Sequence, residues 1–448
     1  MFTRLQSLFA ACLFAASLAT SFIGMGVKAV VAAGWAVNDG AAKAFATRFY
    51  ESFLTGSSFG EAVSAARKAA HDAVPGCNTW AAYQCYGDPD WRLRWTPGDA
   101  QAPSAPLALA LAHVASLPGL ILALRTLAVR AKYHHERDEA AQGALRALER
   151  RFDAAWGQHG ELCEAFGNVW LAMGDRQAAA AWFERAIAAD DGAATFKAAE
   201  NLYNLRARAA FDALQGKLQG FDKPSAALTP EQSRQLRASA ASASMAIEAV
   251  VEALSRLSAL SETAERANLC GSACKRLSMV HRAAEEHEQA AACITRMRGY
   301  YACGWQLSKG KAHVDAFYSA MNVLAAAVAS GDAWDPQLAE QVRALVRQHY
   351  LAAPDFWNVT ASVEIAAWEA LALSRLEQRS ATLEASLADV HDRVSDPSMW
   401  SSVLDQTRFV VTARSHRCPP SPAEQAAVDG LLAVLSAYAQ CPAPEPRR

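Results

Sequence analysis

Several residues have types and spacings that could support chemistry, and each group has to be weighed against a simpler structural role. His71 lies close in the sequence to Cys77 and Cys85, and a histidine beside a cysteine is the pair that activates a thiol nucleophile. Cys77 falls in a Pro-Gly turn, however, and Cys85 lies within an apolar segment. We therefore expect neither sulfur to be held beside a base, and we expect no catalytic residue among these three.

A metal site is the second possibility that the side chains raise. Cys270 and Cys274 are four residues apart and would share one helix face, with His281 two turns further on. No fourth ligand is evident, and cysteine also serves as a small residue where helices meet. The His134-His135 dipeptide likewise lacks ligands at suitable spacing. Without a phosphate-binding glycine loop or a serine nucleophile elbow either, the sequence predicts no metal and no cofactor.

The composition narrows the class of protein. A chain of 448 residues is long enough for two or three domains, and its formal net charge of −2 gives no electrostatic case for nucleic acid as a partner. Alanine inflates the hydrophobic fraction of 52%, and glycine and proline are few, so most of the chain is expected to be helical. The ten cysteines form no short, regular framework, which favours reduced thiols in a cytoplasmic protein.

Residues 26–94 would have to position any site near the N-terminus. Their pattern predicts a strand, two helices and a second strand, in this order. Residues 28–37 are short and mostly apolar, as in a strand buried on both faces. Asn38 then precedes an alanine-rich run, which is a helix-capping signal. Ser58 and Glu61 form a loose capping box for a second helix. Residues 80–86 predict the second strand, and Gly-Asp-Pro ends it.

This stretch resembles the C-terminal part of a CHAT domain, the caspase-like fold of the HetF-associated peptidases. The resemblance implies an α/β caspase-like partial domain at residues 1–95, a parallel-sheet fragment with helices. Ala36 stands where the family often has proline. The matching residues are Gly26, Ala29, Val30, Val31, Ala32, Trp35, Val37, Asp39, Phe49, Tyr50, Gly56, Ala62, Ala65, Arg67, Trp80, Ala81, Ala82, Tyr83, Gly87, Asp88 and Pro89.

CHAT proteins that cleave peptides resemble caspases in using a His–Cys dyad, and that dyad lies N-terminal to the matching stretch. We therefore expect this chain to lack the catalytic His and Cys and not to be proteolytic by itself. The resemblance also implies that the loop after the first strand borders the substrate groove, which makes Trp35, Asn38 and Asp39 candidate groove residues. The alternative is that Trp35 belongs to the core and Asp39 caps a helix.

The first 24 residues allow two interpretations. In the first interpretation, they imitate a secretory signal peptide, with a positive residue at Arg4, an apolar run over residues 8–18 and small residues at Ala19 and Ser21. The other interpretation is that residues 13–24 form the amphipathic helix that precedes the first strand in CHAT domains. Because this segment leads without a break into the strand, we favour the helix and a cytoplasmic protein, with a signal peptide or anchor as the alternative.

A linker is predicted at residues 96–106, which contain three prolines and small polar residues. Residues 107–124 are long enough to suggest a membrane span, but a proline-glycine pair at Pro118 splits them and Arg125 follows. We expect two short buried helices there, and therefore no membrane partner. A charged helix is expected over residues 130–152, and residues 441–448 are expected to form a disordered tail.

Residues 162–191 resemble one tetratricopeptide (TPR) repeat. Small residues in the motif would let two helices approach closely while aromatic residues fill the space between them. One repeat cannot bury its apolar face alone, so the sequence predicts an all-helical, TPR-like solenoid over residues 107–440. The motif residues are Gly167, Trp170, Gly174, Ala179, Phe183 and Ala186.

Three hypotheses for the function follow. The first is a CHAT–TPR protein that derives from a bacterial cysteine-peptidase effector and binds a protein or peptide partner through its helical repeats. The second is a truncated or degenerate chain that acts only as a protein-binding helical scaffold. The third is a membrane-associated or secreted helical protein.

Overall fold

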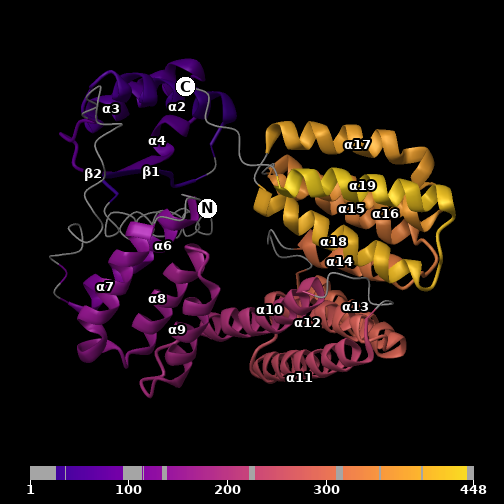
Figure 1. Cartoon of the computed structure of the whole chain (residues 1–448). Helices are drawn as coiled ribbons and strands as arrows, with labels where there is room; N and C mark the ends of the chain where they lie inside the picture. The colour runs from indigo at the N-terminus through magenta and orange to yellow at the C-terminus, as the bar shows by residue number, and fades with distance from the viewer. Residues whose placement is uncertain are drawn as a thin grey trace. The chain divides into compact units, whose positions relative to one another are not determined.

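The structure, a computed structural model, divides into two compact units, Met1–Ala194 and Thr195–Arg448, which are described separately (Figure 1). The N-terminal segment 1–24, the linker 96–106 and the tail 441–448, for which the sequence makes predictions, lie outside the residues that the structure describes. Those described residues are 27–35, 37–93, 114, 116–133, 139–220, 228–308, 316–352, 355–394 and 397–440.

The first unit opens with the strand–helix–helix–strand order that the sequence predicts. The Asn38 side chain accepts a hydrogen bond from the backbone N–H of Ala41 (3.1 Å) and so caps the first helix. The predicted capping box of Ser58 and Glu61 is present at the start of the second. The elements are β1 (Ala29–Ala33), α2 (Asp39–Leu54), α3 (Phe59–Ala73), α4 (Thr79–Ala82) and β2 (Tyr83–Gly87).

The two strands pair antiparallel, so the expected parallel arrangement is wrong for this pair. Ala29 lies opposite Gly87 and Ala33 opposite Tyr83. The reason is that α2 and α3 have similar lengths and pack against each other, which brings the chain back to the carboxyl end of β1. There the Gly34 N–H donates to the carbonyl of Ala82 (2.8 Å). A strand that starts at this end can only run back along β1.

An aromatic core lies between this sheet and its helices. Phe45, Phe49 and Phe53 recur every four residues, which places them on one face of α2. Phe45 stacks on Tyr83 of β2, with ring centroids 3.9 Å apart. The strand predicted at residues 80–86 is correct only from Tyr83 onward, because the preceding residues form the short helix α4.

The described residues of the first unit form four further helices. Pro118 lies in the first turn of α6, where its missing N–H leaves no helical hydrogen bond unmade. α6 continues to Tyr133, so the charged helix expected from residue 130 in fact begins later, at Glu139. Within the described residues, no helix is both long and apolar enough to cross a bilayer. The helices are α6 (Leu117–Tyr133), α7 (Glu139–Trp156), α8 (Gly160–Ala172) and α9 (Arg176–Ala188).

The second unit is helical throughout its described residues, as the sequence predicts. Consecutive helices pack against one another from α10 to α17, as do α18 and α19, and several helices pack on the next helix but one, as α10 does on α12 and α17 on α19. α14 also packs against α18, which brings distant parts of this unit together. The helices are α10 (Phe196–Gly220), α11 (Pro230–Leu260), α12 (Ala264–Ala283), α13 (His287–Ser308), α14 (Ala316–Ala329), α15 (Pro336–Ala352), α16 (Phe356–Ala372), α17 (Leu376–Arg393), α18 (Pro397–Ser415) and α19 (Pro422–Gln440).

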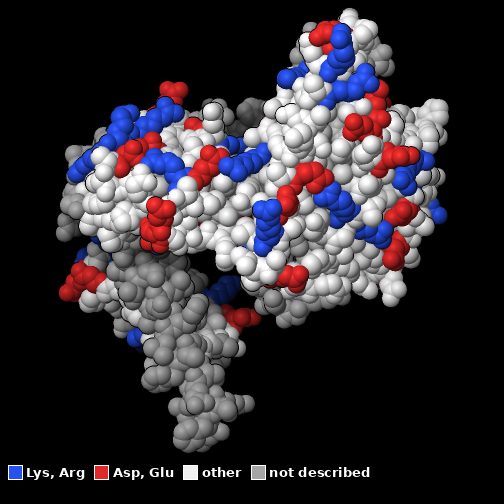
Figure 2. Space-filling view, turned by 90° about the horizontal axis from the view of Figure 1, so that it is seen from below, with Lys and Arg blue, Asp and Glu red and all other residues white. Residues whose placement is uncertain are grey.

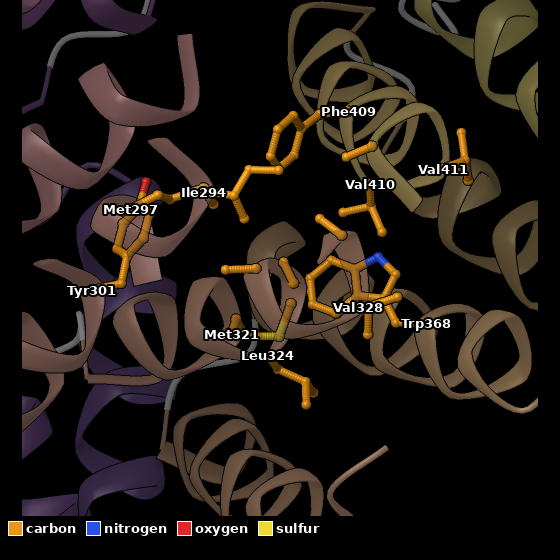
Figure 3. Packing of buried hydrophobic residues seen from close by; sticks show 14 of the residues in the cluster. Ile294, Met297, Tyr301, Met321, Leu324, Val328, Trp368, Phe409, Val410 and Val411 are labelled. Atoms are coloured by element: carbon orange, nitrogen blue, oxygen red, sulfur yellow. The ribbon is translucent and has the colours of Figure 1, made fainter. Parts of the chain in front are cut away.

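One large hydrophobic core holds the second unit together. Side chains of α13, α14, α16 and α18 converge in its interior, among them Ile294, Met321, Trp368 and Phe409 (Figure 3). On the outside, the face drawn in Figure 2 shows basic and acidic side chains interspersed among the described residues, without a broad basic surface.

Candidate functional site

The loop between β1 and α2 holds the three predicted groove residues. Trp35 is half-buried, and its indole Nε1 is enclosed without a hydrogen-bond acceptor. The backbone N–H of Asn38 donates to the Thr79 hydroxyl (2.9 Å), which ties the loop to α4. Asp39 is exposed in the first turn of α2. The capping role thus belongs to Asn38 rather than Asp39, and a substrate groove at this loop stays a prediction.

The residues that could have formed a thiol–imidazole pair lie in separate surroundings. His71 Nδ1 is 3.4 Å from the carboxylate of Asp72, and its ring meets Trp80 edge-on. Burial raises the pKa of the Cys85 thiol, which points to the Tyr83 carbonyl 3.8 Å away. In the part of the chain that the structure describes, no thiol forms a hydrogen bond with a histidine. These surroundings stabilise the neutral thiol and not the thiolate that a nucleophile requires.

Cys270 and Cys274 of α12 are core residues. Burial raises the pKa of their thiols to about 11 and about 12, respectively. His281 is engaged elsewhere, since its Nδ1 lies 2.6 Å from the Glu286 carboxylate and its Nε2 lies 3.3 Å from the Ser244 hydroxyl. Among the described residues, no three side chains of the kinds that bind metals are grouped.

The TPR-motif residues lie at the contact between α8 and α9. A Cβ added at Gly167 would come within 2.7 Å of the Phe183 ring, so the two helices approach closely at this point. Trp170 is fully buried, as are Ala179 and Ala186. Gly174, with a φ of +82°, makes the left-handed turn between the helices, and the Asp175 side chain then caps α9 by accepting from the Ala178 N–H (2.9 Å).

Glu149 of α7 is a polar partner of this helix pair that the sequence does not reveal. Its carboxylate accepts hydrogen bonds from the indole N–H groups of Trp170 and Trp182, the latter at 2.6 Å. One side chain therefore joins α7 to both α8 and α9. Because its partners lie 21 and 33 residues further along, only the three-dimensional packing shows it.

The second unit contains a polar cluster that the sequence also does not reveal. Lys275 Nζ of α12 donates to the Gln406 side-chain oxygen of α18 (2.9 Å). The Gln406 amide donates in turn to the Asn322 side-chain oxygen of α14 (3.3 Å), and the Asn322 amide donates to the carbonyl of Tyr318 (2.9 Å). Glu364 of α16 interacts electrostatically with Lys275. We call Lys275, Asn322, Glu364 and Gln406 the Lys275 cluster.

The surroundings of the Lys275 cluster disfavour the charged forms of Lys275 and Glu364. Burial, together with the neighbouring Arg276, lowers the pKa of the Lys275 ammonium to about 8, although Asp405 and Glu364 act in the opposite direction. Burial raises the pKa of the Glu364 carboxyl to about 8, against the opposing effect of Lys275. In the described residues, no carboxylate lies within 4 Å of Lys275 and no cationic group lies within 4 Å of Glu364. Both side chains nevertheless keep some solvent-accessible surface.

The Lys275 cluster places charged and polar side chains next to apolar ones. The Lys275 ammonium lies 5.8 Å from the centre of the Phe409 ring, and Arg276 donates to the hydroxyl of Ser272 (2.9 Å). A partly enclosed ammonium without a counter-ion favours an incoming anion, because the interaction is less screened than in water. Enclosed titratable groups with shifted pKa values are also more frequent at functional sites than elsewhere.

Comparisons with known proteins found a family match for the N-terminal part of the chain. A protein-family model described as CHAT domain matches residues 14–88, which confirms the resemblance seen in the sequence. No curated protein matches the chain. Among solved structures, the crystal structure of the apo form of RapI is similar over 89% of this chain and 98% of that one, at 9% identity and a TM-score of 0.33.

Proposed function

We propose that this chain is a CHAT-type protein whose helical region binds a protein or peptide partner, and that it does not cleave peptides by itself. The CHAT match over residues 14–88 supports the relation to peptidases. The observation that carries the binding function is the Lys275 cluster, in which an ammonium without a counter-ion is hydrogen-bonded across α12, α18 and α14.

A peptide fits the chemistry of the Lys275 cluster. A carboxylate of the partner would pair with Lys275, while backbone amides would exchange hydrogen bonds with the side-chain amides of Gln406 and Asn322. Helical-repeat proteins commonly bind extended segments in this way, with side chains from several neighbouring helices. If the helical region had no binding partner, the partly enclosed charge of Lys275 would have no carboxylate of the described residues within 4 Å to offset it.

A peptide-display selection against the full chain tests this proposal. We expect enriched peptides to share an acidic residue, and we expect Lys275→Met to weaken their binding at least tenfold in fluorescence polarisation. Lys68→Met is the matched control, because Lys68 is exposed on α3 and pairs with the exposed Asp72. A selection that enriches only peptides whose binding is unaffected by Lys275→Met would overturn the proposal.

A further inference from the structure

A second site lies at one end of four helices of the second unit. A cavity of about 410 Å³ opens where α12 and α18 end, α13 begins and α14 ends. This volume is within the range of small-molecule pockets. Its floor is apolar and well buried, and it is formed by Ala290, Ile294, Ala329 and Ala413.

The rim of this cavity is cationic. The Nη1 atom of Arg282 is enclosed by protein and has no hydrogen-bond acceptor. Arg298 is neutralised by Asp332 at 2.8 Å. Within the described part of the chain, no carboxylate lies within 4 Å of either Arg282 or Arg417. Glu288 is the other acidic residue of the lining, so at least one positive charge remains.

Two histidines complete the rim. The rings of His287 and His416 lie 4.7 Å apart between centroids and are tilted relative to each other. Burial lowers the pKa of His416, and the nearby Arg282 and His287 lower it further, because a third positive charge at this place is unfavourable.

We propose that this pocket binds a small molecule that combines a phosphoryl group with an apolar body. The two guanidinium groups, neither with a carboxylate of the described residues within 4 Å, suit a dianion better than a single carboxylate, because a guanidinium group is a planar, permanently charged donor that matches phosphoryl oxygens. The N-terminus of the 22-residue helix α13 faces the same cavity and favours negative charge further. The apolar floor accommodates the rest of the ligand. This inference does not depend on the Lys275 cluster or on a peptide partner.

Phenyl phosphate is a suitable probe, because it has both parts of the proposed ligand. Titrated into the full chain by calorimetry at pH 7.5, it should bind saturably and at least tenfold more tightly than benzoate or inorganic phosphate, while phenol should not bind. Arg417→Gln, at an exposed position, should weaken its binding about tenfold, and Arg282→Gln should do the same. Arg256→Gln should leave binding unchanged, since Arg256 is exposed on α11 and does not line the cavity.

Absence of saturable binding at millimolar phenyl phosphate would overturn the proposal. Equal affinity for benzoate would overturn the phosphoryl preference, and equal affinity for inorganic phosphate would overturn the role of the apolar floor. If Arg282→Gln changes the circular dichroism spectrum, Arg417→Gln decides: unchanged affinity in that variant also contradicts the site.

Discussion

Glu364 and Lys275 illustrate how surroundings decide the charge of a residue. Both lie in the same cluster, and burial shifts their pKa values in opposite directions until both are near 8. In water an acid and an amine are separated by about six pH units. Near neutral pH, Glu364 is therefore largely protonated and Lys275 is largely charged. The positive charge of Lys275 is then not offset by a negative charge on Glu364.

A pH dependence of stability follows from Glu364. Between about pH 4.3 in the unfolded chain and about 8 in the folded one, the folded state keeps a proton that the unfolded state has lost. The contribution of Glu364 to the free energy of unfolding is therefore fully present at low pH and declines as the pH rises through this window. Glu364→Gln should remove that decline.

Urea unfolding at pH 5 and pH 8 measures this effect. The midpoint of the natural chain should fall more between the two pH values than that of Glu364→Gln, and the exposed Glu377→Gln should behave like the natural chain. Identical pH dependence in all three proteins would show that Glu364 titrates at its ordinary value in the fold.

At the scale of the elements, close helix contacts depend on small residues. Gly167 illustrates this at the α8–α9 contact, where the Phe183 ring takes the space that a Cβ would need. Gly271 plays the same part between α12 and α13, with an added Cβ 2.8 Å from the Tyr301 ring. Such contacts can be anticipated where the sequence has a known motif, as at Gly167, but Gly271 has an obvious partner only in the structure.

Gly167→Ala should destabilise the first unit by about 1–3 kcal/mol, because the buried Phe183 ring has to move. Gly143→Ala is the matched helical control: nothing lies within 4 Å of its added Cβ, so the substitution should stabilise α7 by about 0.5–1 kcal/mol. Chemical denaturation followed by circular dichroism measures both. A loss of stability in Gly143→Ala equal to that in Gly167→Ala would contradict the close-contact explanation.

A buried ion pair joins α10 to α12. Arg266 Nε lies 2.8 Å from the Glu200 carboxylate, and their side chains are only 4% and 8% exposed. Removing one partner leaves a buried charge without compensation, so Glu200→Ala should cost about 3–5 kcal/mol of unfolding free energy. Glu252→Ala, which breaks an exposed pair with Arg256, should cost less than about 1 kcal/mol. Similar urea midpoints for the two variants would show that burial of the pair is unimportant.

At the scale of the whole molecule, the sequence predicts the features that depend on residues close together in the chain. The caps at Asn38 and Ser58, the helical second unit and the CHAT resemblance all follow from nearby residues. The direction of β2 does not, because it depends on where two packed helices return the chain. The Lys275 cluster is equally hidden, since Lys275 and Gln406 are 131 residues apart.

We expect the whole chain to show no thiol-dependent peptidase activity. The buried thiols of the described residues have raised pKa values, as for Cys85 and Cys274, which suppresses the thiolate. Incubation with a fluorogenic peptide library, with and without a thiol-alkylating reagent, checks this expectation. Cleavage that the reagent abolishes would contradict it.

The most direct test of partner binding through the Lys275 cluster is whether binding takes up a proton. An anionic group beside Lys275 favours its charged form, so its pKa should rise from about 8 when the partner binds. Calorimetry of a selected acidic peptide at pH 8, in two buffers of different ionisation enthalpy, should show proton uptake with the natural chain and none with Lys275→Met. Tight binding without proton uptake, unchanged by Lys275→Met, would contradict the account.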